Sequence, residues 1–484
     1  MKLKSLLFWS ALCCMLSPLS LFGQEQSISL TTSKPVGTAI SISVNRIIDG
    51  FSIDWGDGVP VSYEKSQDFL RTVTAATKGS QIKVSTTGNL TTFICEGAGI
   101  TELDLKNAKQ LRSLYVANNE LETLSFSGLS EMVDIDISGN RLTKLTIPES
   151  TLKLLQNLNI SNNEIERYNN YKRFRYGRAS LEHLNISGNK FETLLTGVNT
   201  NLETLIAGEN LLTTIDVSSN PELSVFTCND NAITELVLDE TAGLPKLKQF
   251  NCDNNTISSL NLSKSTKLLD LSCANNGMTE IKLPAVTLSS MNCGDNALTF
   301  ASLPISSRKP QEGFFIYKPQ SGIDLVSLGL LRQNEETGGY YMEQCPSYAD
   351  RNNDEYKLSL ASYRYDSNGS ATVNIDWYHM EAGEPIKMVR ATAGQPSNDF
   401  TNSSGVYTFL KPFTEVYAEL THSSYPDLFI QTTHFAIGKE NATSIQSIEA
   451  TSAVNHRVYD LQGRRVMQPR NGMYIIDGKK VYVK

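Results

Sequence analysis

One spacing of apolar and polar positions repeats along the middle of the chain, between residues 90 and 300. Its clearest copy reads Leu268-x-x-Leu271-x-Cys273-x-x-Asn276-x-Met278-x-x-Ile281-x-Leu283. Copies recur about every 21 residues, which cannot be the period of a single helix or strand. Each copy is therefore expected to form one coil of a solenoid, which buries its apolar face only by stacking on its neighbours.

One asparagine marks each copy. The nine asparagines are Asn119, Asn140, Asn163, Asn189, Asn210, Asn231, Asn255, Asn276 and Asn296. A tenth copy precedes them and carries Ala98 at the asparagine position, which suits an end repeat. Because a carboxamide has both donors and acceptors, we interpret the nine asparagines as structural groups that pair with buried backbone at the coil corners.

Alternating apolar residues within each copy, such as Leu184 and Ile186, predict a short strand with one face inward. The repeated phrase resembles the leucine-rich repeat. The predicted fold class is mainly β: a leucine-rich-repeat solenoid with an N-terminal β cap, a C-terminal immunoglobulin-like β-sandwich and a short β tail. The expected ranges are a signal peptide at 1–23, the cap at 24–89, about ten repeats at 90–301, the sandwich at 302–440, and a linker with the tail at 441–484.

The segment before the repeats has two parts. Residues 1–23 combine Lys2 and Lys4 with an apolar stretch and Gly23, which is the pattern of a secretory signal peptide and too short for a membrane span. Residues 24–89 contain short alternating runs, and we expect these strands to cover the first coil. The run 53–58 resembles a turn of PKD-like β-domains, and calcium bound by Asp54 and Asp57 is the less favoured alternative.

The segment after the repeats is rich in β-type runs separated by turn residues, which indicates a β-sandwich. Trp377 in mid-run and the pattern of residues 405–418 resemble immunoglobulin-like domains. The expected strands are 323–326, 357–365, 371–380, 406–409, 415–421 and 428–437, and the last stretch, 458–484, predicts three more short strands with a hairpin turn at Asp477-Gly478.

Composition adds an acidic balance and an unusual placement of cysteine. The formal net charge is −8, and loss of Lys2 and Lys4 with the leader leaves 41 basic against 51 acidic residues. Such a chain has no overall positive field for nucleic acid, and no second apolar run approaches the length of a transmembrane segment. Cys228, Cys252, Cys273 and Cys293, with Cys95 in the first copy, occupy one inward position, so we expect a buried, reduced column. A thiolate metal column is the less favoured alternative.

The sequence proposes no reaction and no cofactor. Five histidines are scattered without a metal-binding spacing, and no nucleophile elbow, phosphate-binding loop or Cys-x-x-Cys pair is present. The segment 350–354 lacks the glycine and glutamate of a calcium loop. We therefore expect a protein that is not an enzyme, unless catalytic residues assemble across repeats.

Two surfaces are candidates for binding. The first is the outward face of the repeat strands, expected to be concave and polar, with Tyr115, Asp136, Asn159, Asn185 and Asn251 among its residues. The second is an insertion within the longest step, between Asn163 and Asn189, where basic and aromatic side chains gather. Its candidate residues are Tyr168, Tyr171, Arg173, Arg175, Tyr176 and Arg178.

The whole arrangement resembles the internalin-like surface proteins of the Bacteroidetes, and the tail resembles the sorting signal of the type IX secretion system. This resemblance implies an exported protein, displayed at the outer-membrane surface or secreted, that mediates protein–protein recognition, adhesion to host cells or other bacteria, and biofilm formation. The implied partner is a host or bacterial surface protein. A carbohydrate-binding or structural envelope protein is the alternative.

Overall fold

The computed structural model describes residues 25–45, 50–64, 68–148, 151–168, 173–175, 180–303, 314–342, 358–391, 399–438, 458–459, 472–476 and 479–483. The predicted signal peptide and the segment 350–354 lie outside these residues. The chain divides into two compact units, Met1–Asn255 with Lys264–Leu268 and Thr256–Ser263 with Leu269–Lys484, and each is described by itself. Both are built of β-strands, and the described residues contain only short 3-10 turns, at Thr151–Lys153 and Ala361–Arg364. The mainly β fold class is confirmed.

The first unit begins with strands that extend both sides of the first coil. One sheet has the order β4-β3-β6-β1-β8, in which β8 (Ile100–Asp104) belongs to the first coil. On the other side, β2 pairs with β5 and with β7 (Thr92–Ile94). Trp55 and other apolar side chains are buried between these sheets, so the apolar end of the coils is covered. The remaining strands are β1 (Gln26–Thr32), β2 (Ala39–Asn45), β3 (Phe51–Asp54), β4 (Pro60–Tyr63), β5 (Leu70–Ala76) and β6 (Gln81–Thr86).

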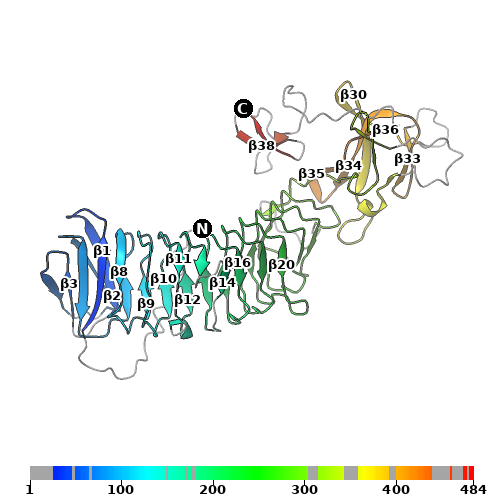
Figure 1. Cartoon of the computed structure of the whole chain (residues 1–484). Helices are drawn as coiled ribbons and strands as arrows, with labels where there is room; N and C mark the ends of the chain where they lie inside the picture. Colours follow the sequence, from blue (N-terminus) through cyan, green and yellow to red (C-terminus); the bar gives the residue numbers. More distant parts are fainter. Residues whose placement is uncertain are drawn as a thin grey trace. The chain divides into compact units, whose positions relative to one another are not determined.

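Each coil contributes a three-residue strand to a parallel sheet, which we call the front sheet (Figure 1). The middle residue of each strand, such as Leu114 or Leu184, is buried, because alternate residues of a strand point to opposite faces. In the first unit the front strands after β7 are β9 (Ser113–Tyr115), β10 (Asp134–Asp136), β12 (Asn157–Asn159), β15 (His183–Asn185), β17 (Thr204–Ile206), β19 (Val225–Thr227) and β21 (Gln249–Asn251). In the second they are β23 (Asp270–Ser272), β25 (Ser290–Asn292) and β26 (Phe315–Ile316).

The opposite side of the coils carries shorter ladders, which we call the back strands. In the first unit β11 pairs with β13, and β14, β16, β18 and β20 form a four-stranded parallel sheet. In the second unit β22 pairs with β24. These strands are β11 (Lys144–Leu145), β13 (Arg167–Tyr168), β14 (Arg173–Arg175), β16 (Thr193–Leu195), β18 (Thr214–Asp216), β20 (Glu235–Val237), β22 (Ser259–Asn261) and β24 (Glu280–Lys282).

The repeated asparagines hydrogen-bond to the backbone of two coils at once. Oδ1 of Asn210 accepts from the N–H of Phe191 (3.1 Å), and its Nδ2 donates to the carbonyls of Ile186 (3.0 Å) and Gly208 (3.0 Å). Phe191 and Ile186 belong to the preceding coil. The same pattern recurs at Asn119, Asn140, Asn163, Asn189, Asn231, Asn255 and Asn296, and Asn276 likewise accepts from the N–H of Ile257 in the coil before it.

The residue before each of these asparagines adopts a left-handed backbone conformation, which favours glycine and asparagine. At this position φ lies between 52° and 63° in all nine coils, at Asn118, Gly139, Asn162, Gly188, Glu209, Asp230, Asn254, Asn275 and Asp295. Glu209 is the only one of these nine residues that is not glycine, asparagine or aspartate, so its backbone carries the most strain.

Both ends of the asparagine ladder depart from the pattern for a physical reason. No coil precedes the first one, so a carboxamide at position 98 would have no backbone of an earlier coil to bond. The carbonyl of Ala98 instead accepts from Oγ1 of Thr32 in the cap (2.6 Å). At the other end Gln320 takes the role: its Oε1 accepts from the N–H of Leu298 (2.9 Å) and its Nε2 donates to the carbonyl of Cys293 (2.8 Å). Gln320 follows β26, which pairs in parallel with β25, so this last coil lies beyond residue 301.

The inward position after the front strand holds the cysteine column. Cys95, Cys228, Cys252, Cys273 and Cys293 are fully buried and form no disulfide. Burial raises the pKa of Cys95 from 9.0 to about 12 and raises the pKa of Cys228 and Cys293 still further. These thiols therefore stay protonated at neutral pH, as the prediction of a buried, reduced column requires.

The second unit continues from its coils into two packed sheets. Trp377 on β30 is 1% exposed and meets Tyr407 and Phe409 of β33 edge to face, with ring centroids 5.3 Å and 4.9 Å apart. The seven-stranded sheet contains β27 (Arg332–Gln333), β28 (Tyr340–Met342), β30 (Asn374–Glu381), β31 (Glu384–Lys387), β34 (Phe413–His422), β35 (Tyr425–Gln431) and β36 (Phe435–Ile437), and the three-stranded sheet contains β29 (Leu358–Ser359), β32 (Phe400–Ser403) and β33 (Val406–Phe409). Two sheets joined by an aromatic core match the predicted β-sandwich.

Aromatic rings join the last coil to the seven-stranded sheet. Tyr425 at the start of β35 is fully buried and contacts the rings of Phe300, Phe315 and Tyr317, at centroid distances of 4.9 to 6.1 Å. The sandwich thus covers the apolar end of the coils in the second unit, where a solenoid needs a cap.

Two of the strands expected in this region are wrong. Ile323 forms only an isolated bridge to Thr432, and the run then becomes a turn, in which Oδ1 of Asp324 accepts from the backbone N–H groups of Val326 (2.9 Å) and Ser327 (3.3 Å). The run 357–365 keeps only β29 and then becomes the 3-10 turn Ala361–Arg364. Local side-chain bonds to the backbone compete with a sheet ladder, and the apolar pattern does not reveal them.

The tail forms three strands, as expected from its alternation. β37 (Val458–Tyr459) and β39 (Lys479–Val483) both pair antiparallel with β38 (Gly472–Ile476). The predicted turn at Asp477-Gly478 lies outside the described residues.

Candidate binding surfaces

The register of the front sheet aligns its outward side chains in two rows. The first row runs from Ser113 to Asp134, Asn157, His183 and Thr204, and the second from Tyr115 to Asp136, Asn159, Asn185 and Ile206. Neighbouring strands are about 4.8 Å apart, so adjacent members of a row are within contact distance. A partner lying across the coils would meet side chains from several repeats together.

Part of the first row is buried, contrary to the expectation that all of it faces solvent. Ser113 and Asp134 are only 6% and 4% exposed. Oδ2 of Asp134 accepts from the hydroxyl of Ser113 (2.9 Å), and its Oδ1 accepts from the amide of Asn157. Burial raises the pKa of Asp134, while these two hydrogen bonds and the charge of Arg112 oppose the rise. Asp134 is thus a centre that holds its neighbours in place.

Much of the second row also serves the fold. Oδ1 of Asp136, Asn159 and Asn185 each accepts from the N–H and the hydroxyl of the serine two residues later, at 2.6 to 3.2 Å. Asn251 accepts from the N–H of Asp253 in the same way (2.9 Å). These Asx-type turns fix the corner that leads to the asparagine ladder. The amide-rich character of this face therefore has a structural cause, whatever it binds.

One nitrogen in each of two side chains, Arg112 just before β9 and His183 in the first row, has no partner. Nε of Arg112 and Nδ1 of His183 are buried and form no hydrogen bond to a described residue, and Arg112 forms no ion pair with a described residue. Tyr115 lies two residues after Ser113, and Glu96 is exposed at the end of the first coil. Burial and the nearby Asp136 raise the pKa of the Glu96 carboxyl. We call Glu96, Arg112, Tyr115, Asp136 and His183 the front patch.

Sequence reasoning placed Arg112 and His183 on the outward face of the repeat strands, but it did not single out Glu96. The repeat frame does not tell which outward groups find partners inside the fold. That information comes only from the hydrogen bonds around Asp134.

The basic and aromatic insertion lies on the other side of the coils. Its residues 167–168 form β13, which pairs with β11 of the preceding coil, and residues 173–175 form β14, which pairs with β16 of the next coil. The backbone at Tyr168, Arg173 and Arg175 is thus part of the back strands, whereas Tyr171, Tyr176 and Arg178 lie outside the described residues.

The calcium alternative in the cap has a simpler explanation. Oδ1 of Asp54 accepts from the N–H groups of Gly56 (2.9 Å) and Gly58 (3.0 Å), and Asp57 pairs with Lys78 (2.7 Å). These bonds shape the turn. Within the described ranges no group of three or more His, Cys, Asp or Glu side chains is placed to hold a metal ion.

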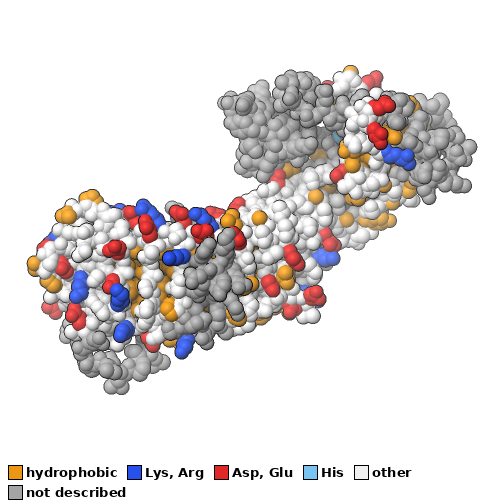
Figure 2. Space-filling model, viewed as in Figure 1, with side chains coloured by type: hydrophobic (Ala, Val, Ile, Leu, Met, Phe, Trp, Pro, Cys, Tyr) orange, Lys and Arg blue, Asp and Glu red, His pale blue; other side chains and the backbone are white. Residues whose placement is uncertain are grey.

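Charge is mixed over the described surface. Figure 2 shows acidic and basic side chains interspersed on the visible face of the first unit, without a large area of one sign. None of the helical turns that the structure describes is long and apolar enough to span a membrane.

The fold and its repeated phrase together define a leucine-rich-repeat protein. No protein-family model matches the sequence, and a search of curated proteins finds no match. Among solved structures, the chain is similar to the functional domain of InlJ from Listeria monocytogenes, which includes a cysteine ladder (16% identity, TM-score 0.31, 74% of this chain and 92% of that chain). It is also similar to an internalin-like protein of the same bacterium (15%, 0.34, 70% and 90%) and to YopM, a leucine-rich effector protein from Yersinia pestis (20%, 0.35, 46% and 56%). The chain spans a little over half of the YopM chain, and these likenesses concern the repeat fold alone.

Proposed function

We propose that the protein is an exported recognition protein of the cell surface, which binds a protein partner through the front patch. The observation that carries this proposal is the grouping of Arg112, Tyr115 and His183 near the buried Asp134 at the front sheet. Arginine and tyrosine are the side chains that dominate the binding energy of protein interfaces. A partner that presents carboxylates would pair with the partly exposed Arg112 side chain.

The biological role that we propose is adhesion to host cells or to other bacteria, with biofilm formation as the consequence. The repeat strands support this proposal because they offer a row of side chains to one extended partner. A glycan is the alternative ligand, since outward amide groups also suit sugar hydroxyls. Outer-membrane display through the tail is part of the proposal and rests on the sorting-signal resemblance.

The test of the partner uses the purified chain, immobilised and exposed to whole bacteria or host cells. A protein partner predicts that treating the cells with protease abolishes attachment, whereas a glycan partner predicts attachment that survives protease and is competed by free sugar. The triple variant R112Q/Y115S/H183Q should reduce attachment at least tenfold, because it removes the guanidinium, the imidazole and the aromatic ring of the front patch. The exposed single change Glu96→Gln probes the same surface with little risk to folding.

The matched control is the insertion on the back strands. R173S/R175S/Y176S should leave attachment unchanged if the front patch is the site. Attachment lost in this variant and retained in the front-patch variant would assign binding to the insertion instead. Lys190→Gln, which removes only an exposed ion pair with Glu164, controls for a general loss of surface charge.

The test of location is a truncation of residues 458–484. If this tail directs display, the truncated protein should accumulate in the periplasm and become inaccessible to protease added to intact cells. Unchanged surface display would leave the tail with a structural role only.

A further inference from the structure

The front sheet of the first unit ends at β5, which pairs with β2 on one side and with no described strand on the other. The strand order runs from β9 through β7 and β2 to β5, so the outer edge of β5 faces away from the coils of this unit. The cap strands occupy one end of the first unit (Figure 1). Another chain can therefore approach this edge without meeting those coils.

Alternate residues of β5 direct their backbone groups to this outer edge. In an antiparallel pair, successive residues alternate between bonding the partner strand and pointing away from it. The N–H of Thr77 donates to the carbonyl of Thr38, just before β2 (2.9 Å), so the odd-numbered residues of β5 are the ones that bond β2. The residues whose N–H and C=O groups point to the outer edge are Leu70, Thr72, Thr74 and Ala76.

The edge of β5 lacks the features that usually prevent strand pairing, which are proline, clustered charge, bulges and short length. β5 has seven residues in unbroken register with β2, and Arg71 is its only charged residue. By contrast β4, at the edge of the other cap sheet, has four residues and begins with Pro60. Phe69 and Leu70 are 68% and 45% exposed, so apolar side chains are available to cover a strand that pairs with β5.

The sequence of β5 is complementary to itself in the antiparallel direction. When Val73 of one copy lies opposite Val73 of another, Thr72 faces Thr74. Arg71 then faces an alanine, so no like charges are opposed. Leu70 also faces an alanine, which leaves room for the larger side chain. This register pairs the whole strand, and its outward backbone groups meet as hydrogen-bonded pairs.

We propose that two copies of this chain join their front sheets at β5, antiparallel and centred on Val73, to form a dimer. The twofold axis of such a pair is perpendicular to the sheet, so both front faces lie on the same side. Only one strand and its flanking side chains are buried in each copy, which is a small interface. The dimer should therefore dissociate with a Kd in the micromolar range.

The dimer presents two front patches on one side. The row of Tyr115 continues across β7, β2 and β5 through Ile94, Ser43 and Thr72. At about 4.8 Å per strand, the two Tyr115 side chains are roughly 35 Å apart. Two linked patches hold a surface with many identical partners more firmly than one, because the second binding event is intramolecular. This consequence rests on the function proposed for the front patch, whereas the dimer itself does not.

Charge substitution at Thr72 and Thr74 tests both the interface and its register, because each faces the other across the twofold axis. Association of the purified chain is followed by sedimentation velocity over a range of concentrations. T72K/T74K and T72E/T74E each oppose like charges and should raise the Kd by at least about tenfold. An equimolar mixture of these two variants should restore dimers.

The matched control is T72E/T74K. It loses the same exposed hydroxyls, which bond to Ser43 and Ser41 (2.8 Å each), but it opposes unlike charges across the axis. It should therefore retain the dimer, and a loss of dimer in the other two variants is then not a loss of folding. The front-patch variant R112Q/Y115S/H183Q should also sediment as a dimer, so that failure of the proposed attachment and failure of the dimer are separate results.

A chain that stays monomeric at concentrations approaching millimolar would overturn the proposal, even if this edge binds a strand of another protein. Self-association that T72K/T74K and T72E/T74E leave unchanged would also overturn it, because the contact would then lie on another surface. A T72E/T74K variant that fails to dimerise while the unchanged chain does so would contradict the register centred on Val73.

Discussion

Replacing Asn210 by alanine tests whether the asparagine ladder holds the coils together. Its carboxamide serves the N–H of Phe191 and the carbonyl of Ile186, and both residues are fully buried. Alanine cannot replace either bond, and each buried backbone group left without a partner costs about 1–3 kcal/mol. Because water can enter the space that the side chain leaves, we expect Asn210→Ala to lower the free energy of unfolding by about 3 kcal/mol.

Substitution of the neighbouring residue, Glu209, is a control that should change the free energy of unfolding in the opposite direction. Glu209 is exposed and adopts φ = 54°, a conformation that costs a residue with a side chain about 1–2 kcal/mol relative to glycine. Glycine also loses more conformational freedom on folding, so Glu209→Gly should be neutral or stabilise by up to about 1 kcal/mol. Two adjacent substitutions in one coil are thus expected to act in opposite directions.

The assay is urea unfolding followed by circular dichroism, together with hydrogen exchange at the N–H of Phe191. Exchange is included because repeat arrays open locally, so the loss should be largest in the coils on either side of Asn210. A loss below about 1 kcal/mol in Asn210→Ala would refute the reasoning. So would a Glu209→Gly variant that is destabilised as much as Asn210→Ala.

Two further predictions follow from burial. Because burial raises the pKa of Cys95 from 9.0 to about 12, the thiol stays protonated in the folded state while it ionises in the unfolded state, so its stabilising effect is complete below pH 9 and is lost as pH rises towards 12. Unfolding free energies measured across this range should fall, and they should fall less steeply in Cys95→Ala. Deleting residues 24–89 should expose the edge of β7 and the apolar interior of the first coil, which gives aggregates in size-exclusion chromatography. A monomeric product with native circular dichroism would show that the coils need no cap.

The repeat fold could be predicted because its information is local and repeated. The apolar frame around Leu184 and the asparagine at the corner recur in nine successive copies, so errors in one copy are corrected by the others. The left-handed backbone conformation before each asparagine could also be predicted, because glycine, asparagine or aspartate fills this position in eight of the nine copies. The role of Gln320 could not be predicted, because an interruption in the repeat pattern separates it from the last regular copy.

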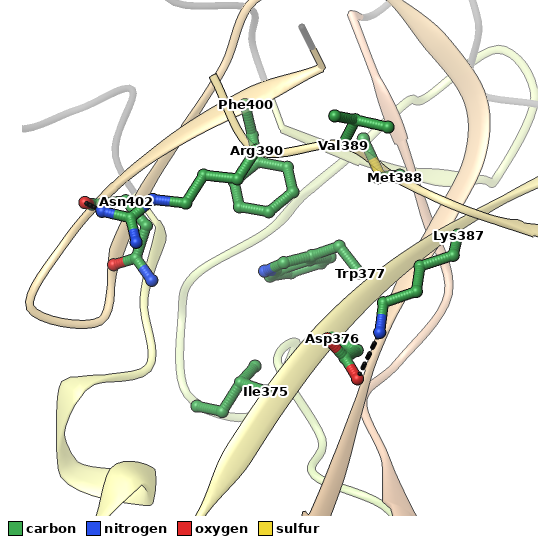
Figure 3. Close-up of a pocket in the computed structure, with 9 residues that line it drawn as sticks. All are labelled: Ile375, Asp376, Trp377, Lys387, Met388, Val389, Arg390, Phe400 and Asn402. Carbon is green, nitrogen blue, oxygen red and sulfur yellow. Dashed lines mark hydrogen bonds and ion pairs between the residues drawn. The ribbon is translucent and has the colours of Figure 1, made fainter. Parts of the chain in front are cut away.

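The binding surface was less predictable than the fold. Polar residues such as Asn159 and Asn185 look alike in sequence whether they face a partner or close a turn, and only their hydrogen bonds to Ser161 and Ser187 separate the two cases. The insertion gave a clear compositional signal, yet its position on the back strands depends on how β13 and β14 pair with different coils. The pocket lined by Trp377, Met388 and Phe400 (Figure 3) is formed by β30, β32 and the segment after β31, which meet only in the folded sandwich.

The carboxamides bond to the backbone of the preceding coil, and this arrangement affects how the number of coils can change. Insertion of one complete copy between two others would supply its own asparagine, which would bond to the backbone of the coil before it. No buried backbone group would then be left without a hydrogen bond. Only the two ends use different hydrogen bonds: Thr32 donates to Ala98 at the start, and Gln320 bonds to Cys293 and Leu298 at the other end. Evolution could therefore lengthen or shorten the front sheet in steps of one coil while the contacts at both ends stay the same.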